Sequence, residues 1–98
     1  MNANEIEAIR QACMATIAGY TYFADSGVFD RAVTFFTPDG LWLRGGTPLN
    51  GREEIRKSLE GRKPGMIIRH IIGSAWVEPK NGDTADVVTT YMAYHAQG

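Results

Sequence analysis

Apolar side chains recur every three or four positions in the first quarter of the chain, which predicts an amphipathic helix over residues 4–24. The apolar stripe consists of Ile6, Ile9, Cys13, Ile17, Tyr20 and Ala24. Ser26-Gly27 ends this helix, since glycine readily adopts the left-handed conformation common just after a helix end. A helix with one apolar stripe must bury it against another element, so we expect the rest of the chain to supply a sheet.

The middle of the chain alternates short apolar groups with turn residues. Thr37-Pro38-Asp39-Gly40 has the composition of a turn, because proline fixes one φ angle and glycine tolerates a positive one. The expected elements are a short helix over 28–36, this turn, a short strand over 41–43, a loop over 45–48, and a peripheral helix that begins after residue 51 and ends near 62.

The last third of the chain predicts a hairpin. Residues 66–77 are rich in β-branched side chains, and Asn81-Gly82 is a strong signal for a tight turn between two strands. We therefore expect two long strands, over about 66–78 and 84–96. Helices followed by strands indicate an α+β fold, with the long helix laid across a curved and mostly antiparallel sheet.

The register of this hairpin follows from its turn. If Asn81 and Gly82 form a two-residue loop, Lys80 lies opposite Asp83 and His70 lies opposite Ala93. Paired residues share a face, so one face would carry His70, Trp76, Tyr91 and His95. A loop longer by one residue would move the last two to the other face. Both faces are partly apolar, so periodicity alone does not choose between these registers.

Composition indicates one small domain over residues 1–98. The chain is 44% hydrophobic and has a formal net charge of −1, with charges dispersed along its length. This composition argues against nucleic acid or an anionic membrane as a partner. No apolar run is long enough to span a bilayer and no secretory signal is visible, so we expect a cytoplasmic protein. The single cysteine and two histidines give no metal-site pattern, and Cys13 is interpreted as core packing.

Candidate chemistry lies at Asp25, near the end of the first helix, and at Arg69-His70, within a predicted strand. A carboxylate that orients an imidazole in an apolar pocket forms a general base at neutral pH. Each residue also has a structural interpretation. Asp25 is suited to capping the second helix, His70 to a core position bonded to backbone, and Arg69 to pairing with a surface carboxylate.

Several landmarks in order and spacing carry a resemblance to a known family. They are Tyr20 to Gly27, Phe35 to Trp42, Gly51 to Ile55, Arg69-His70, and Gly82 to Ala85. Together they resemble SnoaL-like domains of the nuclear transport factor 2 (NTF2) superfamily, in its scytalone dehydratase-like branch. The resemblance implies an NTF2-like cone with a pocket at its open end. It also implies an acid–base dyad at Asp25 and His70 that needs neither a metal nor an organic cofactor.

Further pocket residues are expected from the same resemblance and from the predicted register. They are Tyr20, Tyr22, Trp42, Trp76, Tyr91 and His95. Of these, His95 is the weaker match to a second pocket histidine, and near the chain end a solvated position is the alternative. The two tryptophans are interpreted as core or pocket wall rather than as reacting groups.

The function implied is a cofactor-independent lyase or isomerase of dehydratase type, acting on a small hydrophobic or polycyclic molecule. The alternatives are a non-catalytic ligand-binding or dimerisation module of the NTF2-like fold, and a fragment with neither property. Family members continue for two more strands beyond the one that holds Tyr91, and these are missing here. An open strand edge invites association, so we expect a homodimer joined through the sheet, with Tyr91 and Tyr94 near the interface.

Overall fold

The computed structural model describes residues 1–97 and contains three α-helices, one 3-10 helix and four strands within that range. In chain order these are α1 (Ala3–Asp25), α2 (Phe29–Ala32), η1 (Val33–Phe35), β1 (Leu41–Arg44), β2 (Thr47–Asn50), α3 (Gly51–Glu60), β3 (Met66–Pro79) and β4 (Ala85–Gln97). The predicted α+β class is confirmed. None of the described helices is long and apolar enough to cross a membrane.

Helix α1 has a definite start and a close neighbour. The Asn2 side chain accepts from the Glu5 backbone N–H at 2.9 Å, and the Glu5 carboxylate accepts from the Asn2 N–H at 3.4 Å, which forms a capping box. Gly27 follows the helix with φ of 78°, as the sequence predicts. A Cβ atom at Gly19 would overlap the Phe35 ring, so glycine lets α1 approach the following segment closely.

The short strands β1 and β2 form a hairpin around Gly45-Gly46, whose φ angles are 56° and 85°. Two successive positive φ angles are typical of the tight turns that join antiparallel strands. The prediction of a loop over residues 45–48 is therefore wrong in its second half. Thr47 and Pro48 belong to β2, where proline is tolerated because the sheet has only two strands and both have a free edge.

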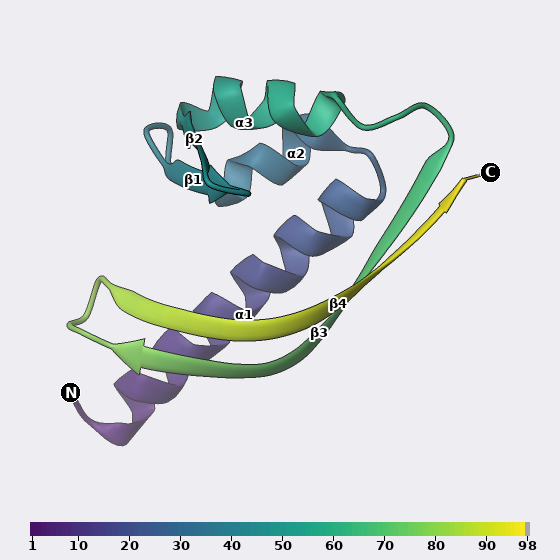
Figure 1. Ribbon diagram of the computed structural model, residues 1–98. Coiled ribbons are helices and arrows are strands. Elements are labelled where there is room, and N and C mark those ends of the chain that lie inside the picture. Colours follow the sequence, from purple (N-terminus) through teal and green to yellow (C-terminus); the bar gives the residue numbers. More distant parts are fainter. Residues whose placement is uncertain (98) are drawn as a thin grey trace.

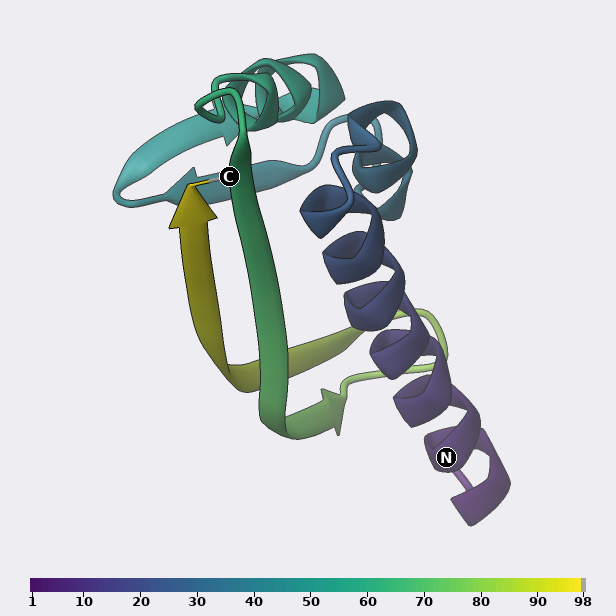
Figure 2. The ribbon, with the colours of Figure 1, turned by 90° about the vertical axis from the view of Figure 1, so that its right-hand side faces the viewer.

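The hairpin of β3 and β4 curves beside α1, while α2, α3 and the β1–β2 hairpin lie around the C-terminal end of that helix (Figures 1 and 2). The two hairpins are separate antiparallel sheets. This arrangement gives the predicted cone: α1 forms one side, β3 and β4 curve around another, and the β1–β2 hairpin lies across one end (Figure 2).

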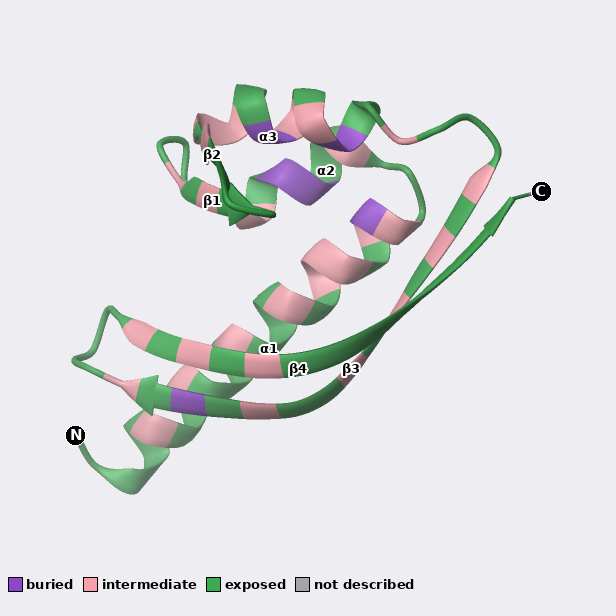
Figure 3. Ribbon diagram, viewed as in Figure 1, coloured by how far each residue is buried: buried purple, intermediate pink, exposed green. Residues whose placement is uncertain are grey.

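The hydrophobic core gathers at the C-terminal end of α1 (Figure 3). Its buried members are Ala24, Ala32, Val33, Ile55 and Leu59, with Tyr20, Phe23, Phe29, Phe36, Trp42 and Leu49 packed against them. Outside this cluster, the remaining buried apolar residue of the described range is Val77 on β3. The core therefore anchors the end of α1 that carries Asp25.

The turn of the long hairpin differs from the prediction. Lys80 N–H donates to the Thr84 carbonyl at 2.9 Å, so the loop has three residues and not two. The cause is the Asn81 side chain, whose oxygen accepts from the backbone N–H groups of Asp83 and Thr84 and builds a wider local turn. The predicted pairing of Lys80 with Asp83 is wrong.

A β-bulge between Ile72 and Ala75 compensates for the longer loop. Here β3 contains one extra residue, at Gly73-Ser74, and the Thr89 hydroxyl donates to the Ser74 carbonyl at 3.1 Å. Beyond the bulge, His70 lies opposite Ala93, as predicted. Of the two registers that the sequence left open, this pairing places Tyr91 and His95 on the same face as His70.

Trp76 lies on the loop side of the bulge, so its predicted face is wrong. It pairs with Val88 instead of Val87 and is 60% exposed, while its neighbour Val77 is buried. One extra residue in the strand reverses the alternation of side chains. Trp76 therefore lies on the face opposite that of His70.

Candidate active site

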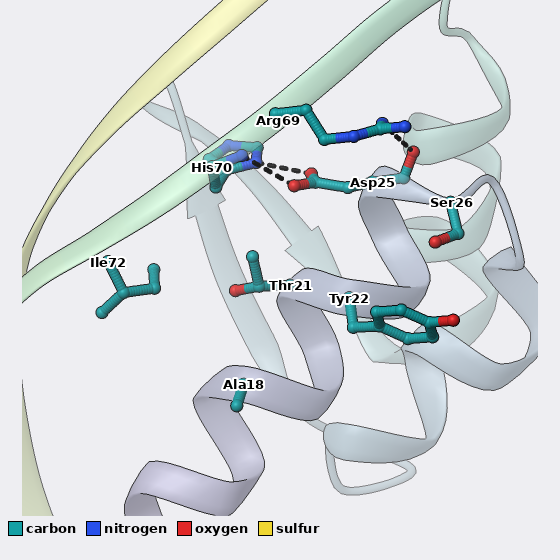
Figure 4. A pocket seen from close by; sticks show the side chains of 8 residues that line it. All are labelled: Ala18, Thr21, Tyr22, Asp25, Ser26, Arg69, His70 and Ile72. Atoms are coloured by element: carbon teal, nitrogen blue, oxygen red, sulfur yellow. Dashed lines mark hydrogen bonds and ion pairs between the residues drawn. The ribbon is translucent and has the colours of Figure 1, made fainter.

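Asp25 and His70 meet at the junction of α1 and β3 (Figure 4). One carboxylate oxygen, Oδ1, lies 2.6 Å from the ring Nδ1 of His70, and the other, Oδ2, accepts from the His70 backbone N–H at 2.7 Å. That N–H bonds to Asp25, so it points away from β4, toward the free edge of β3. The carboxylate thus accepts a hydrogen bond from the backbone at the free edge of β3 and, at the same time, orients the His70 ring. The predicted contact between the two side chains is present.

This geometry excludes the structural interpretation of each residue. The N-cap of α2 is Val28, and no side chain caps that helix. Asp25 instead points to β3, and its side chain is only 9% exposed. The His70 ring bonds to this carboxylate and not to a backbone group.

The contact also determines which ring nitrogen carries a proton. An ionised carboxylate can only accept hydrogen bonds, so Nδ1 of His70 must be the donor to Asp25. In the neutral ring this leaves a lone pair on Nε2, which has no hydrogen-bond partner within residues 1–97. The ring is 31% exposed, so a small molecule can reach it. The arrangement is chemically able to accept a proton at Nε2, with the carboxylate stabilising the resulting imidazolium.

Two arginines surround the C-terminal end of α1. Arg62 donates to the carbonyls of Ala24 and Asp25. Arg69 donates through Nη1 to the carbonyls of Ile68, at 2.7 Å, and Asp25, at 3.4 Å. The last carbonyls of a helix lack intrahelical partners and carry partial negative charge, so cations are favoured there. Arg69 forms no ion pair within residues 1–97, and its predicted pairing with a surface carboxylate is wrong.

Tyr20 lies one turn before Asp25 and packs edge-on against Phe36 and Trp42, with ring centroids 5.4 and 6.2 Å away. Burial raises the pKa of the Tyr20 hydroxyl above its usual value of about 10. Nearby Arg44 opposes this rise, whereas Asp25 contributes to it. Tyr20 therefore remains a neutral O–H donor at physiological pH.

The raised pKa of Tyr20 makes stability depend on alkaline pH. Above the unfolded pKa of about 10, the unfolded chain loses the phenol proton while the native protein keeps it, so the free energy of unfolding falls as pH rises. We expect Tyr20→Phe to flatten this part of the curve. The free energy of unfolding in urea at pH 9 and pH 11 measures it, with the exposed Tyr22→Phe as the matched control. An equal pH dependence in both variants would contradict the assignment.

A cleft of about 340 Å³ lies beside the dyad, between α1 and β3 (Figure 4). It is lined by Ala18, Thr21, Tyr22, Asp25, Ser26, Arg69, His70 and Ile72. The helix contributes positions spaced by three and four residues, which form one stripe along α1. The sequence predicts three of these eight residues as site residues, namely Tyr22, Asp25 and His70, and not Ala18, Thr21, Ser26, Arg69 or Ile72. The four-residue spacing of Ala18 from Tyr22 and of Thr21 from Asp25 is a signal that could have found two of them.

The structure places three further predicted pocket residues in different parts of the molecule. Tyr91 is next to the dyad, with its ring centroid 5.4 Å from that of His70. Trp42 stacks on Phe36 in the core cluster, on the side of α1 that holds Tyr20. His95 lies farther along β4, exposed and opposite Ile68.

Trp76 is separated from the dyad and belongs to the outer surface. Its indole N–H donates to Glu78 at 3.0 Å, and the Arg10 guanidinium lies 5.7 Å from its ring centroid. It is not a wall of the cleft, and the prediction that placed it beside the dyad is wrong. Within residues 1–97, no three His, Cys, Asp or Glu side chains gather closely enough to hold a metal ion.

Comparison with known protein families shows which family the chain belongs to. The model of the SnoaL-like domain family matches residues 3–98. The chain belongs to the SnoaL-like domain family. A "Putative Scytalone Dehydratase" from Novosphingobium aromaticivorans has a similar structure, with a TM-score of 0.88 and 17% identity, covering 98% of this domain and 66% of that chain. These values confirm the predicted NTF2-like fold.

Two structures from Catenulispora acidiphila are also similar. One has a TM-score of 0.79 and 21% identity, covering 91% of this SnoaL-like domain and 67% of that chain. The other, in complex with S-DNPA, has a TM-score of 0.68 and 25% identity, covering 89% of this domain and 68% of that chain. The domain thus spans about two thirds of the length of each of these structures. No curated protein sequence matches it.

Proposed function

We propose that this SnoaL-like domain binds a small hydrophobic molecule and removes a proton from it, as a cofactor-independent lyase or isomerase. The observation that carries the proposal is the two-point contact of Asp25 with the ring and backbone of His70. This contact supports a tautomer with the proton on Nδ1, in which Nε2 would act as the base. The bond to the backbone N–H satisfies the strand edge, and the second bond, to the ring, is the one that supports a chemical role.

The proposed step begins with transfer of a proton from a substrate C–H group to Nε2 of His70. The electron pair of the broken C–H bond moves into the substrate, where it either forms an enolate or expels a leaving group. Asp25 stabilises the imidazolium that forms, and the proton returns to another atom of the substrate or leaves with the departing group. Tyr91, whose ring centroid lies 5.4 Å from that of His70, is the tyrosine that we propose donates to developing negative charge.

The comparisons support small-molecule binding by this fold. A similar structure at 25% identity holds S-DNPA, and another is described as a scytalone dehydratase. The cleft of about 340 Å³ is near the lower end of the usual range for ligand sites, so we propose a ligand of one or two rings. A cytoplasmic location stays a prediction.

Removal of His70 tests the proposed chemistry. The probe is 5-nitrobenzisoxazole, a small aromatic compound whose ring opens when a base takes its C3 proton and its N–O bond breaks. We expect His70→Gln to lower the protein-dependent rate by about 100-fold or more, because general-base catalysis contributes about 10²–10⁴. Absorbance of the phenolate product gives the rate. Asp86→Asn, an exposed change on β4, is the control and should keep the full rate. Equal rates for His70→Gln and the parent protein would refute the proposal.

A second candidate function, dimerisation, is favoured by the outer face of β3 and β4. Large apolar side chains there are exposed, namely Ile67, Ile71, Trp76, Val88, Met92 and Tyr94. Contiguous exposed apolar surface marks interaction sites, so we propose a homodimer through this face. Tyr94 would lie in the interface, whereas Tyr91 faces His70 on the inner side. Sedimentation at low micromolar concentration distinguishes the dimer from a monomer.

A further inference from the structure

We propose that Arg69 selects organic acids as ligands of the cleft, with the ligand carboxylate on its guanidinium and the hydrophobic body along α1. The inference rests on the proposed function and names the substrate class of the same site. Arg69 would act as a specificity-determining residue rather than as a reacting group.

The first observation is that one side of the Arg69 guanidinium is unused. Both of its hydrogen bonds to the protein leave from Nη1, and they go to the carbonyls of Ile68 and Asp25. Nε and Nη2 donate to no group within residues 1–97. These two nitrogens form the side of the guanidinium that matches the two oxygens of a carboxylate. The two carbonyl contacts hold the side chain in place, so less conformational entropy is lost when an anion binds.

The second observation concerns charge. Among residues 1–97, no carboxylate lies within ion-pair distance of Arg69. The Asp25 carboxylate is nearby, but both of its oxygens accept from His70. Arg62 adds a second cation at the same helix end. This side of the cleft therefore has a positive charge that a ligand anion can neutralise.

The third observation is the arrangement of the cleft, which separates polar from apolar lining (Figure 4). Arg69, Asp25 and Ser26 gather at the C-terminal end of α1. Ala18 lies about two turns earlier along α1, and Ile72 follows His70 on β3, so the His70 ring lies between the polar end and these two apolar side chains. A carboxylate on Arg69 would therefore lay an attached ring over the apolar end and bring the intervening carbon atoms past the His70 ring. The arrangement fits an acid with one or two rings.

The test compares 2-naphthoate with 2-naphthamide, which has the same ring system and no charge. Binding is measured by NMR titration of the ¹⁵N-labelled protein, following the Arg69 Nε–H and the amides of β3. We expect saturable binding of the carboxylate, at least about tenfold tighter than the amide, with the Arg69 Nε–H signal shifted. The preference should weaken on adding salt, because the ion pair is partly exposed.

Arg69→Gln should abolish this preference, and Arg69→Lys should keep only part of it because lysine lacks the forked geometry. Arg10→Gln is the matched control, since it removes the same charge from an exposed position over Trp76. Equal affinity of the parent protein for the two probes would overturn the inference even if Arg69→Gln does not fold. If Arg10→Gln loses the preference for the carboxylate to the same extent, the preference is a general effect of charge. That result would also overturn the inference. Either result would leave the His70-dependent rate untouched, so failure here is distinguishable from failure of the proposed function.

Discussion

Replacing Asp25 with alanine is expected to lower the free energy of unfolding by about 2–4 kcal/mol. The Asp25 carboxylate is 9% exposed and accepts from both the ring and the backbone N–H of His70. Its removal leaves that N–H at the strand edge without its partner and also removes the side-chain bonds by which Asp25 joins α1 to β3. Asp25→Asn keeps one acceptor oxygen and should lose about half as much.

Urea denaturation followed by circular dichroism measures this loss. Asp86→Asn provides the control, because Asp86 is an exposed carboxylate that pairs with Lys80 on the same hairpin. It should leave the denaturation midpoint unchanged, since exposed ion pairs contribute little. If Asp25→Ala unfolds at the same urea concentration as the control, the carboxylate does not join α1 to β3.

Replacing Ile55 with alanine should lower the free energy of unfolding by about 2–5 kcal/mol. Ile55 is the largest fully buried side chain in the described part of the chain, and it packs in the cluster with Ala32 and Leu59. The free energy of unfolding of a small domain is only about 5–15 kcal/mol, so this loss is a large share of the total. Ile55→Val removes one methylene group and should cost about 0.5–1.5 kcal/mol.

Thermal unfolding provides a sensitive measurement, because each 1 kcal/mol shifts the midpoint by about 4–8 °C in a domain of this size. The matched control is Leu43→Ala, since Leu43 is a branched apolar residue exposed on β1, away from the outer face of β3 and β4. The control should unfold close to the parent temperature. Similar losses from Ile55→Ala and Leu43→Ala would contradict the placement of the core at the C-terminal end of α1.

The hairpin shows how far sequence patterns extend. The positions of β3 and β4 follow from β-branched residues and turn composition, and the pairing of His70 with Ala93 is as predicted. The loop that leads to this pairing differs from the prediction. It has one residue more than expected, and the bulge at Gly73-Ser74 compensates for that extra residue. The longer loop depends on a bond between the Asn81 side chain and the backbone, and the bulge on one between the Thr89 hydroxyl and the backbone. The alternation of apolar and polar residues encodes neither bond.

The site divides in a similar way. The contact of Asp25 with His70 could be predicted from motif order, because the fold brings the end of the first helix to the middle of the long strand. The position of the Arg69 side chain beside the cleft could not be predicted. Its backbone position places it on the opposite side of β3 from His70, but a long side chain at a free strand edge can reach around to the helix end. The sequence also predicts a loop at Thr47 and Pro48 of β2, because glycine and proline dominate that stretch.

The protonation of the His70 ring in the unmodified protein tests the central claim most directly. The ¹⁵N chemical shifts of the two ring nitrogens, recorded at a pH high enough to leave the ring neutral, show which nitrogen carries the proton. The contact with Asp25 predicts a proton on Nδ1 and a bare lone pair on Nε2. A neutral ring protonated on Nε2 would contradict the account, because Nδ1 could not then donate to Asp25 and no base would face the ligand.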